Sequence, residues 1–252
     1  MTLLPPNESI AEIAETDLVR RLLAEPHWRE RFFRIHGIPD RAIFFPEVLL
    51  TRLGAEGDID ILAVDPESPA TATAIQVKRI KVSARTFETG RPNKLAAIPE
   101  LQRQSTLLVN LGFHQVFSYV IVVVDSREKN FGEYTFEGLT SGLRSLVDNA
   151  MTTHGLHPDA GFIQFELCQP IDDVPLVTGT FCGRIHRMPK PQVQSARVTN
   201  FVRAVLAPSD ATTKSVNPAQ LNIQTGVLTY PPQIDAPRFR LRADPPRLPR
   251  RG

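Results

Sequence analysis

The chain has 252 residues and a formal net charge of +2, and 42% of its residues are hydrophobic, which excludes a wholly disordered chain. No window is apolar enough for a membrane-spanning helix, and the first residues lack the basic and apolar regions of a secretory signal. The cysteines are Cys168 and Cys182, so we expect free thiols in a cytoplasmic protein that does not contact a membrane.

The N-terminal part of the sequence predicts two helical segments and then three strands. Ser9 and Glu12 have the spacing of a capping box and open a helical pattern, which Pro26 interrupts. A second helical piece follows over 27–36. Alternating patterns then predict strands at 44–53, 58–64 and 72–82, and the short connections between them favour an antiparallel meander.

The central part of the sequence predicts alternating helices and strands. A basic polar stretch over 83–94 precedes a helix at 99–111, which begins with a proline and ends before a glycine. The β-branched run at 116–124 predicts a strand that is buried on both faces. A helix at 139–151 and a strand at 161–168 follow. The pattern is therefore that of an α/β protein with a mixed central sheet flanked by helices.

The chain changes character after residue 173. Residues 174–208 contain basic but no acidic side chains, and we expect them to form a basic extension with a short helix at 195–206. Residues 209–252 are rich in proline and end in an arginine-rich segment, which predicts a disordered tail. The sequence thus predicts one domain over 1–173, followed by the extension and the tail.

Two of the predicted strands carry polar residues that suit phosphate chemistry. The first contains Asp60 in the string Gly-Asp-Ile-Asp-Ile-Leu, and the second contains Gln76 and Lys78 in Ile-Gln-Val-Lys-Arg. Residues two apart share a face of a strand, so Gln76 and Lys78 point the same way. If the two strands pair, both side chains can face Asp60. A carboxylate, an amide oxygen and an ammonium on one face suit a magnesium ion, a water and a phosphate.

These residues resemble the motif of the PD-(D/E)xK nuclease superfamily. Gly-x-Ile-Asp followed by Gln-x-Lys, with Arg79 next, is similar to the Mrr-like branch of restriction endonucleases, and the resemblance covers roughly residues 8–170. It implies a restriction-endonuclease-like αβββαβ core, which agrees with the predicted order of elements. It also implies Mg²⁺- or Mn²⁺-dependent hydrolysis of DNA phosphodiester bonds, in restriction or phage defence.

The resemblance assigns a role to each motif residue. Asp60 is the expected metal ligand, with the Gln76 side chain and the Val77 backbone carbonyl as further ligands. An amide oxygen binds magnesium more weakly than a carboxylate, so Gln76 favours one metal ion over two. Lys78 would position or activate the attacking water. Asp58 is a group on the substrate side. Alternatively, Asp58 and Asp60 are both solvated charges on the exposed face of an edge strand, and Lys78 is an ordinary exposed lysine.

A further acidic ligand would come from the first helix or from the strand that precedes Asp60. Glu12, Glu15 and Glu47 are candidates, and we prefer Glu47 because it heads that preceding strand. For Glu12 the spacing from Ser9 favours a role in capping the helix. Each of the three has an alternative role as an ordinary surface charge.

Basic side chains gather beyond the Gln-x-Lys strand at Lys81, Arg85, Arg91 and Lys94. They would contact the phosphate backbone of a nucleic acid without reading its sequence, or they form a solvated loop. Gln102 and Gln104 lie on the following predicted helix, where we expect surface positions.

Two alternatives to a DNA nuclease stay open. The Gln76 departure from the usual glutamate favours a catalytically silent module that binds nucleic acid or assembles a complex, whereas intact Asp60 and Lys78 oppose it. An RNA-directed nuclease is equally compatible with the motif. Cutting both strands of a duplex commonly needs two sites, so a homodimer or a protein partner is a further hypothesis.

Overall fold

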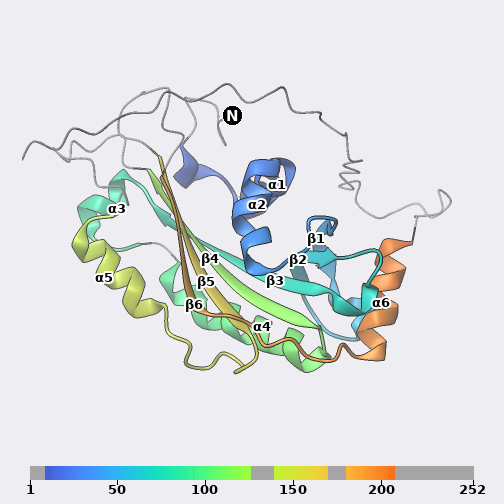
Figure 1. The fold of residues 1–252 in the computed structure, drawn as a ribbon. Coiled ribbons are helices and arrows are strands. Elements are labelled where there is room, and N and C mark those ends of the chain that lie inside the picture. The colour runs from blue at the N-terminus through green and yellow to red at the C-terminus, as the bar shows by residue number, and fades with distance from the viewer. Residues whose placement is uncertain (1–8, 93, 126–138, 170–179, 208–252) are drawn as a thin grey trace, which may run out of the picture. The chain divides into compact units, whose positions relative to one another are not determined.

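Residues 9–92, 94–125, 139–169 and 180–207 are described by the computed structural model, and they form an α/β fold. One six-stranded mixed sheet lies between helices on both faces (Figure 1). All of the described residues fall in one unit, Met1–Gln220. The predicted α/β class with a mixed central sheet is therefore confirmed.

The strands are ordered in the sheet as they are in the sequence. They are β1 (Ile43–Leu49), β2 (Asp58–Val64), β3 (Thr73–Val82), β4 (Gln115–Asp125), β5 (Gly161–Gln169) and β6 (Thr180–Arg187). The β1–β2 and β2–β3 pairs are antiparallel, as the predicted meander requires. The β3–β4 and β4–β5 pairs are parallel, and β6 returns antiparallel to β5.

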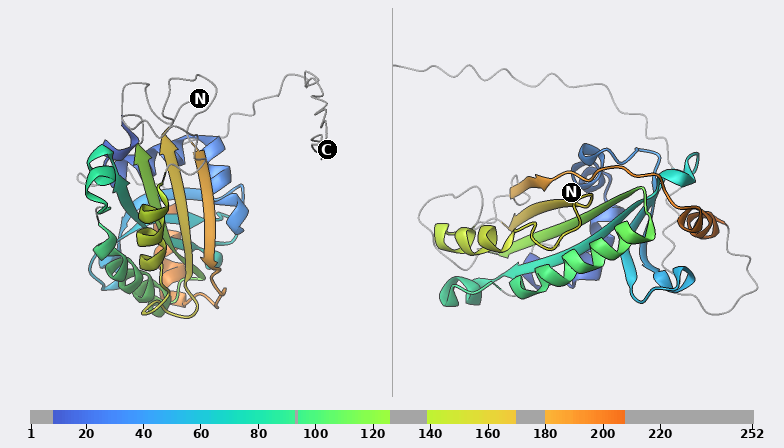
Figure 2. Two further views of the ribbon diagram at one scale, coloured as in Figure 1. Left: turned by 90° about the vertical axis from the view of Figure 1, so that its left-hand side faces the viewer. Right: turned by 90° about the horizontal axis from the view of Figure 1, so that it is seen from below.

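Helices flank the sheet. They are α1 (Glu15–Ala24), α2 (Pro26–Phe32), α3 (Ala84–Thr89), α4 (Ile98–Leu111), α5 (Ser141–Ala150) and α6 (Ala196–Leu206). Helices α1 and α2 lie on one face, and α4 and α5 lie on the other (Figures 1 and 2). Two apolar cores result, one on each side of the sheet.

Strand β4 shows why the sheet is buried on both faces. Val116, Val120 and Val122 belong to the core on the α4 side, whereas Phe117 and Tyr119 belong to the core on the α1 side. A strand in the middle of a parallel arrangement has helices over both faces, so its residues are apolar without alternation.

The core on the α1 side is rich in aromatic rings. Phe32 lies 4.2 Å from Phe165 between ring centroids, and Tyr119 lies 4.9 Å from Phe165. The Tyr119 hydroxyl donates to the Phe32 carbonyl oxygen at 2.9 Å. The same carbonyl oxygen lies 2.8 Å from His36 Nδ1. Burial lowers the pKa of His36, so the ring is neutral at physiological pH.

The start of the chain differs from the expected capping box. Residues 10–12 form a 3₁₀ turn, and α1 begins only at Glu15 after Ala14. The Ser9 hydroxyl donates to the Asp125 carboxylate, and Glu12 forms an ion pair with Lys81. Tertiary partners on β3 and β4 have therefore replaced the local capping contacts, and the capping role predicted for Glu12 is wrong.

Residues 174–208, which the sequence groups as a basic extension, supply two elements of the same fold. Strand β6 pairs with β5 along its length. Helix α6 buries Val198, Phe201 and Val202 in the core on the α4 side. The predicted tail over 209–252 lies outside the described residues. Within the described ranges, no helix is both long and apolar enough to cross a membrane.

Candidate functional site

Strands β2 and β3 separate at Asp60. They pair at Ile61–Ile75, Leu62–Ala74 and Ala63–Thr73, and in this register Gln76 would be the partner of Asp60. Instead, two carboxylates accept hydrogen bonds from the backbone N–H groups of β3 that β2 leaves unpaired. The Val77 N–H donates to Asp60 Oδ2 at 2.7 Å, and the Arg79 N–H donates to Glu15 Oε2 at 2.6 Å.

The alternation of side chains along β1 and β2 is broken at the same level. Ile59 and Leu62 lie in the same core although they are three positions apart, which a regular strand forbids. On β1, Glu47 has a left-handed backbone with φ of 53°. A non-glycine residue in this conformation costs about 1–2 kcal/mol. Neighbouring pairs on either side place Glu47 opposite Asp60, so the two irregular positions coincide.

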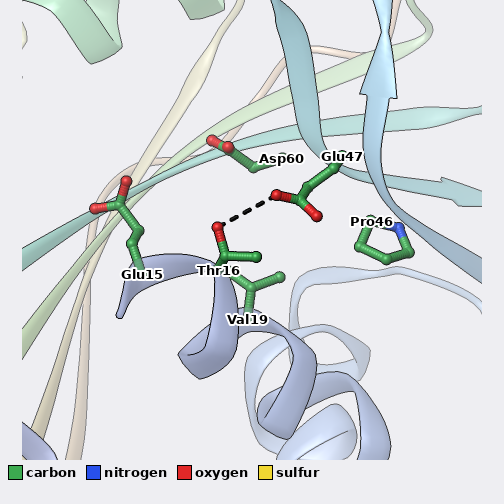
Figure 3. Close-up of a pocket in the computed structure, with 6 residues that line it drawn as sticks. All are labelled: Glu15, Thr16, Val19, Pro46, Glu47 and Asp60. Atoms are coloured by element: carbon green, nitrogen blue, oxygen red, sulfur yellow. Dashed lines mark hydrogen bonds between the residues drawn. The ribbon is translucent and has the colours of Figure 1, made fainter. Parts of the chain in front are cut away.

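A small cavity lies between this irregularity and α1. It is lined by Glu15, Thr16 and Val19 of α1, Pro46 and Glu47 of β1, and Asp60 of β2 (Figure 3). Its volume is about 30 Å³, which is room for a water molecule or a single ion. Three carboxylates from three different elements therefore surround one water-sized space.

The environment of Asp60 disfavours a negative charge. Burial is the largest cause and raises its pKa, from 3.8 to about 7. The hydrogen bond from the Val77 N–H opposes this shift, the negative charges of Asp58 and Glu15 add to it, and the Lys78 ammonium lowers the pKa again. A positive charge placed in the cavity would therefore favour the ionised form of Asp60.

Lys78 reaches the site around the open edge of β3. Its Nζ lies 2.7 Å from Glu15 Oε1, and the two side chains are 21% and 22% exposed. One Glu15 oxygen therefore holds Lys78 and the other holds the backbone of Arg79. The sequence singles out Glu15 as one candidate acid and prefers Glu47, whereas the structure places both at the cavity.

Gln76 lies elsewhere than the sequence suggests. Its side chain is 2% exposed, and its Nε2 donates to the Asp58 carbonyl at 2.7 Å. It shares a strand face with Ala74 and Ile80, which pack on the α4 side, and it does not line the cavity. The separation of the strands is the reason, because it turns Asp60 toward α1 and leaves Gln76 to hold the start of β2.

The Val77 backbone occupies the same open edge. Its N–H bonds to Asp60, and the N–H and C=O of one strand residue point toward the same neighbouring strand. The Val77 carbonyl therefore faces the gap between β2 and β3, which is the side that the sequence-based assignment requires.

The basic residues beyond β3 do not line the cavity. Lys81 is paired with Glu12, whereas Arg85, Arg91 and Lys94 are exposed on and after the short helix α3. Gln102, for which we expected a surface position, is buried at 3% exposure and donates to the Thr152 carbonyl. Its position on the inner face of α4 explains the difference.

The donor set fits a hard divalent cation in kind. Carboxylate oxygens are the preferred ligands of Mg²⁺, and a cation would offset the charge that burial makes costly on Asp60. In the described parts of the chain, no three His, Cys, Asp or Glu side chains are already close enough to hold a metal ion together. Binding would therefore require the Glu15 or Glu47 carboxylate to move toward Asp60.

Comparisons with known proteins give a distant structural match and assign no family. No family model and no curated protein matches the chain. Among solved structures, the chain is similar to a protein of unknown function from Silicibacter pomeroyi, with 14% identity and a TM-score of 0.28. The match covers 69% of this chain and 75% of that one.

Proposed function

We propose that this protein is a metal-dependent nuclease that hydrolyses DNA phosphodiester bonds with a restriction-endonuclease-like core. The observation that carries the proposal is the separation of β2 from β3 beside α1. It gathers Asp60 and Glu15 at one water-sized cavity and holds Lys78 against Glu15. These are the residue types that hydrolysis of a phosphodiester requires.

Asp60 would hold the cation together with Glu15 or Glu47, and the Val77 carbonyl would complete the protein ligands. When bound, Mg²⁺ supplies a Lewis acid for the phosphoryl oxygen and lowers the pKa of a coordinated water. Mn²⁺ accepts the same oxygen ligands. Since Gln76 is buried against the Asp58 carbonyl, its role in this proposal is to hold the separated strands in place.

Lys78 would orient the attacking water and offset the charge on the phosphate. Its ammonium is already fixed by Glu15 at 2.7 Å, so little side-chain freedom is lost when substrate arrives. Exposed basic side chains would contact phosphates farther along the DNA strand, namely those of Arg85, Arg91 and Lys94. Such contacts strengthen binding without recognising the base sequence.

A catalytically silent binding module is the second candidate. It is favoured by the hydrogen bonds from the β3 amides to Asp60 and Glu15, because these contacts alone give both carboxylates a structural role. The exposed basic residues would then be the functional surface. The partner in that case is a nucleic acid that is bound and left intact.

The two candidates differ in cleavage. Wild type, Asp60→Asn and Lys78→Met should be incubated with supercoiled plasmid, linear duplex, single-stranded DNA and RNA, with Mg²⁺, Mn²⁺ or EDTA. The matched control is Lys190→Met, since Lys190 is 74% exposed and lies outside the cavity. Metal-dependent DNA cleavage that only the control retains supports the nuclease. Binding without cleavage would favour the silent module, and cleavage of RNA alone would replace DNA as the substrate.

A further inference from the structure

Helix α1 binds both oxygens of the Glu47 carboxylate. Arg20 donates from one terminal nitrogen to Glu47 Oε2 at 2.9 Å, and the Thr16 hydroxyl donates to Oε1 at 3.3 Å (Figure 3 shows the second contact). Glu47 is the residue with the left-handed backbone, and it faces Asp60 across the cavity. The arginine therefore neutralises an acid that belongs to the candidate metal site.

The Arg20 guanidinium has further N–H donors besides the one that binds Glu47. Its other terminal nitrogen lies 3.6 Å from Asp17, a distance that is too long for a strong hydrogen bond. Its Nε is buried and, within the part of the chain that the structure describes, has no hydrogen-bond partner. The Arg20 and Glu47 side chains are 40% and 38% exposed, so a dissolved ion or substrate can reach the pair.

The pair and a bound cation compete for the same carboxylate. A divalent cation at Asp60 would attract Glu47, because the charge on Glu47 is then balanced at a shorter distance and by two positive charges. The guanidinium released from Glu47 would lie at the rim of the cavity with its planar set of donors exposed. Such a fork matches the oxygens of a phosphate.

We propose that Arg20 is a substrate-positioning residue that binds a phosphodiester oxygen once a divalent cation has taken Glu47 away from it. This inference rests on the proposed function of the cavity and adds a specific consequence. Metal binding and nucleic-acid binding are coupled through one arginine, and by linkage each strengthens the other.

The test measures binding rather than turnover. A short duplex with phosphorothioate linkages, which resist hydrolysis, is titrated with protein in EDTA and in Mg²⁺, and its affinity is read from fluorescence anisotropy. Mg²⁺ binding to the protein alone is measured by calorimetry. The variants are Arg20→Met and Arg20→Lys, and the control is Arg34→Met, since Arg34 forms an exposed ion pair with Asp40 away from the cavity.

Wild type and the control should bind the duplex about tenfold more tightly in Mg²⁺ than in EDTA. Arg20→Met should lose this gain in duplex affinity. It should bind Mg²⁺ at least as tightly as wild type, because the guanidinium that competes with Mg²⁺ for Glu47 is absent. Arg20→Lys should keep only part of the gain, since an ammonium cannot make a two-point contact. It also serves as the decisive variant if Arg20→Met fails to fold.

Two results would overturn the inference in different ways. If Mg²⁺ binds wild type and both Arg20 variants keep the full gain in duplex affinity, Arg20 has no part in coupling and the nuclease proposal stands. If Mg²⁺ does not bind wild type at all, the proposed metal site itself is refuted, and the coupling with it.

Discussion

Replacing Asp60 with asparagine should stabilise the protein at alkaline pH. The amide keeps the size of the side chain and an oxygen to accept the Val77 N–H, but it removes the charge that burial disfavours. A variant at a candidate catalytic residue that gains stability is the expected behaviour of a site that is built for function at a cost in folding free energy.

The magnitude follows from the pKa of Asp60. Its value of about 7 lies roughly three pH units above the usual 3.8, and at 1.36 kcal/mol per unit the full effect is about 4 kcal/mol. Because Asp60 is only partly buried, solvent screening reduces this, and we expect about 2 kcal/mol.

The effect has a defined pH dependence. Between about pH 4 and pH 7 the folded state binds more protons at Asp60 than the unfolded state does, so the wild type loses stability as pH rises through this window. Above about pH 7 the loss is complete, and below about pH 4 it is absent. Asp60→Asn should therefore match wild type in acid and exceed it at about pH 8.

Urea denaturation in EDTA at several pH values between about 5 and 8 measures this difference. Asp60→Glu is the matched control, because it retains the charge. A variant Asp60→Asn that is less stable than wild type at about pH 8, or a difference that does not change with pH, would refute the assigned environment of Asp60.

Three further changes test neighbouring parts of the structure. Glu15→Gln should lower cleavage at least about tenfold, since Lys78 loses a charged partner, and the rate should recover in Glu15→Asp only in part. Glu47→Gly should raise the free energy of unfolding, measured by urea denaturation, by about 1 kcal/mol, because glycine adopts a positive φ without strain. A variant less stable than wild type would contradict this. Phe201→Ala should lower the free energy of unfolding by about 3 kcal/mol in the same assay, and a negligible loss would contradict the packing of α6 on the core.

Regular elements with strong local patterns could be predicted from the sequence. The β-branched run of β4 and the proline-to-glycine frame of α4 carry their own signals, and the structure places both within a few residues of the predicted bounds. Strand β6 carries no such signal. It contains Gly183 and Arg184 at the edge of the sheet, where half-exposed positions do not need apolar residues.

The candidate site could be predicted in its residue types and not in its geometry. The motif identifies Asp60 and Lys78, but the alternation that makes Gln76 face Asp60 holds only while β2 and β3 stay paired. Where they separate depends on Glu15, which is distant in sequence and takes the Arg79 amide. The left-handed backbone at Glu47 could not be predicted from the sequence, because the residue is neither a glycine nor an asparagine.

The most direct test of the nuclease proposal is the cleavage of supercoiled plasmid by wild type and Lys78→Met in Mg²⁺. Both proteins should be shown to be folded, and EDTA should abolish any cleavage. We predict nicked or linear product with wild type and its loss in Lys78→Met. Equal cleavage by both proteins, or none by wild type in either Mg²⁺ or Mn²⁺, would contradict the assignment of this cavity as a nuclease site.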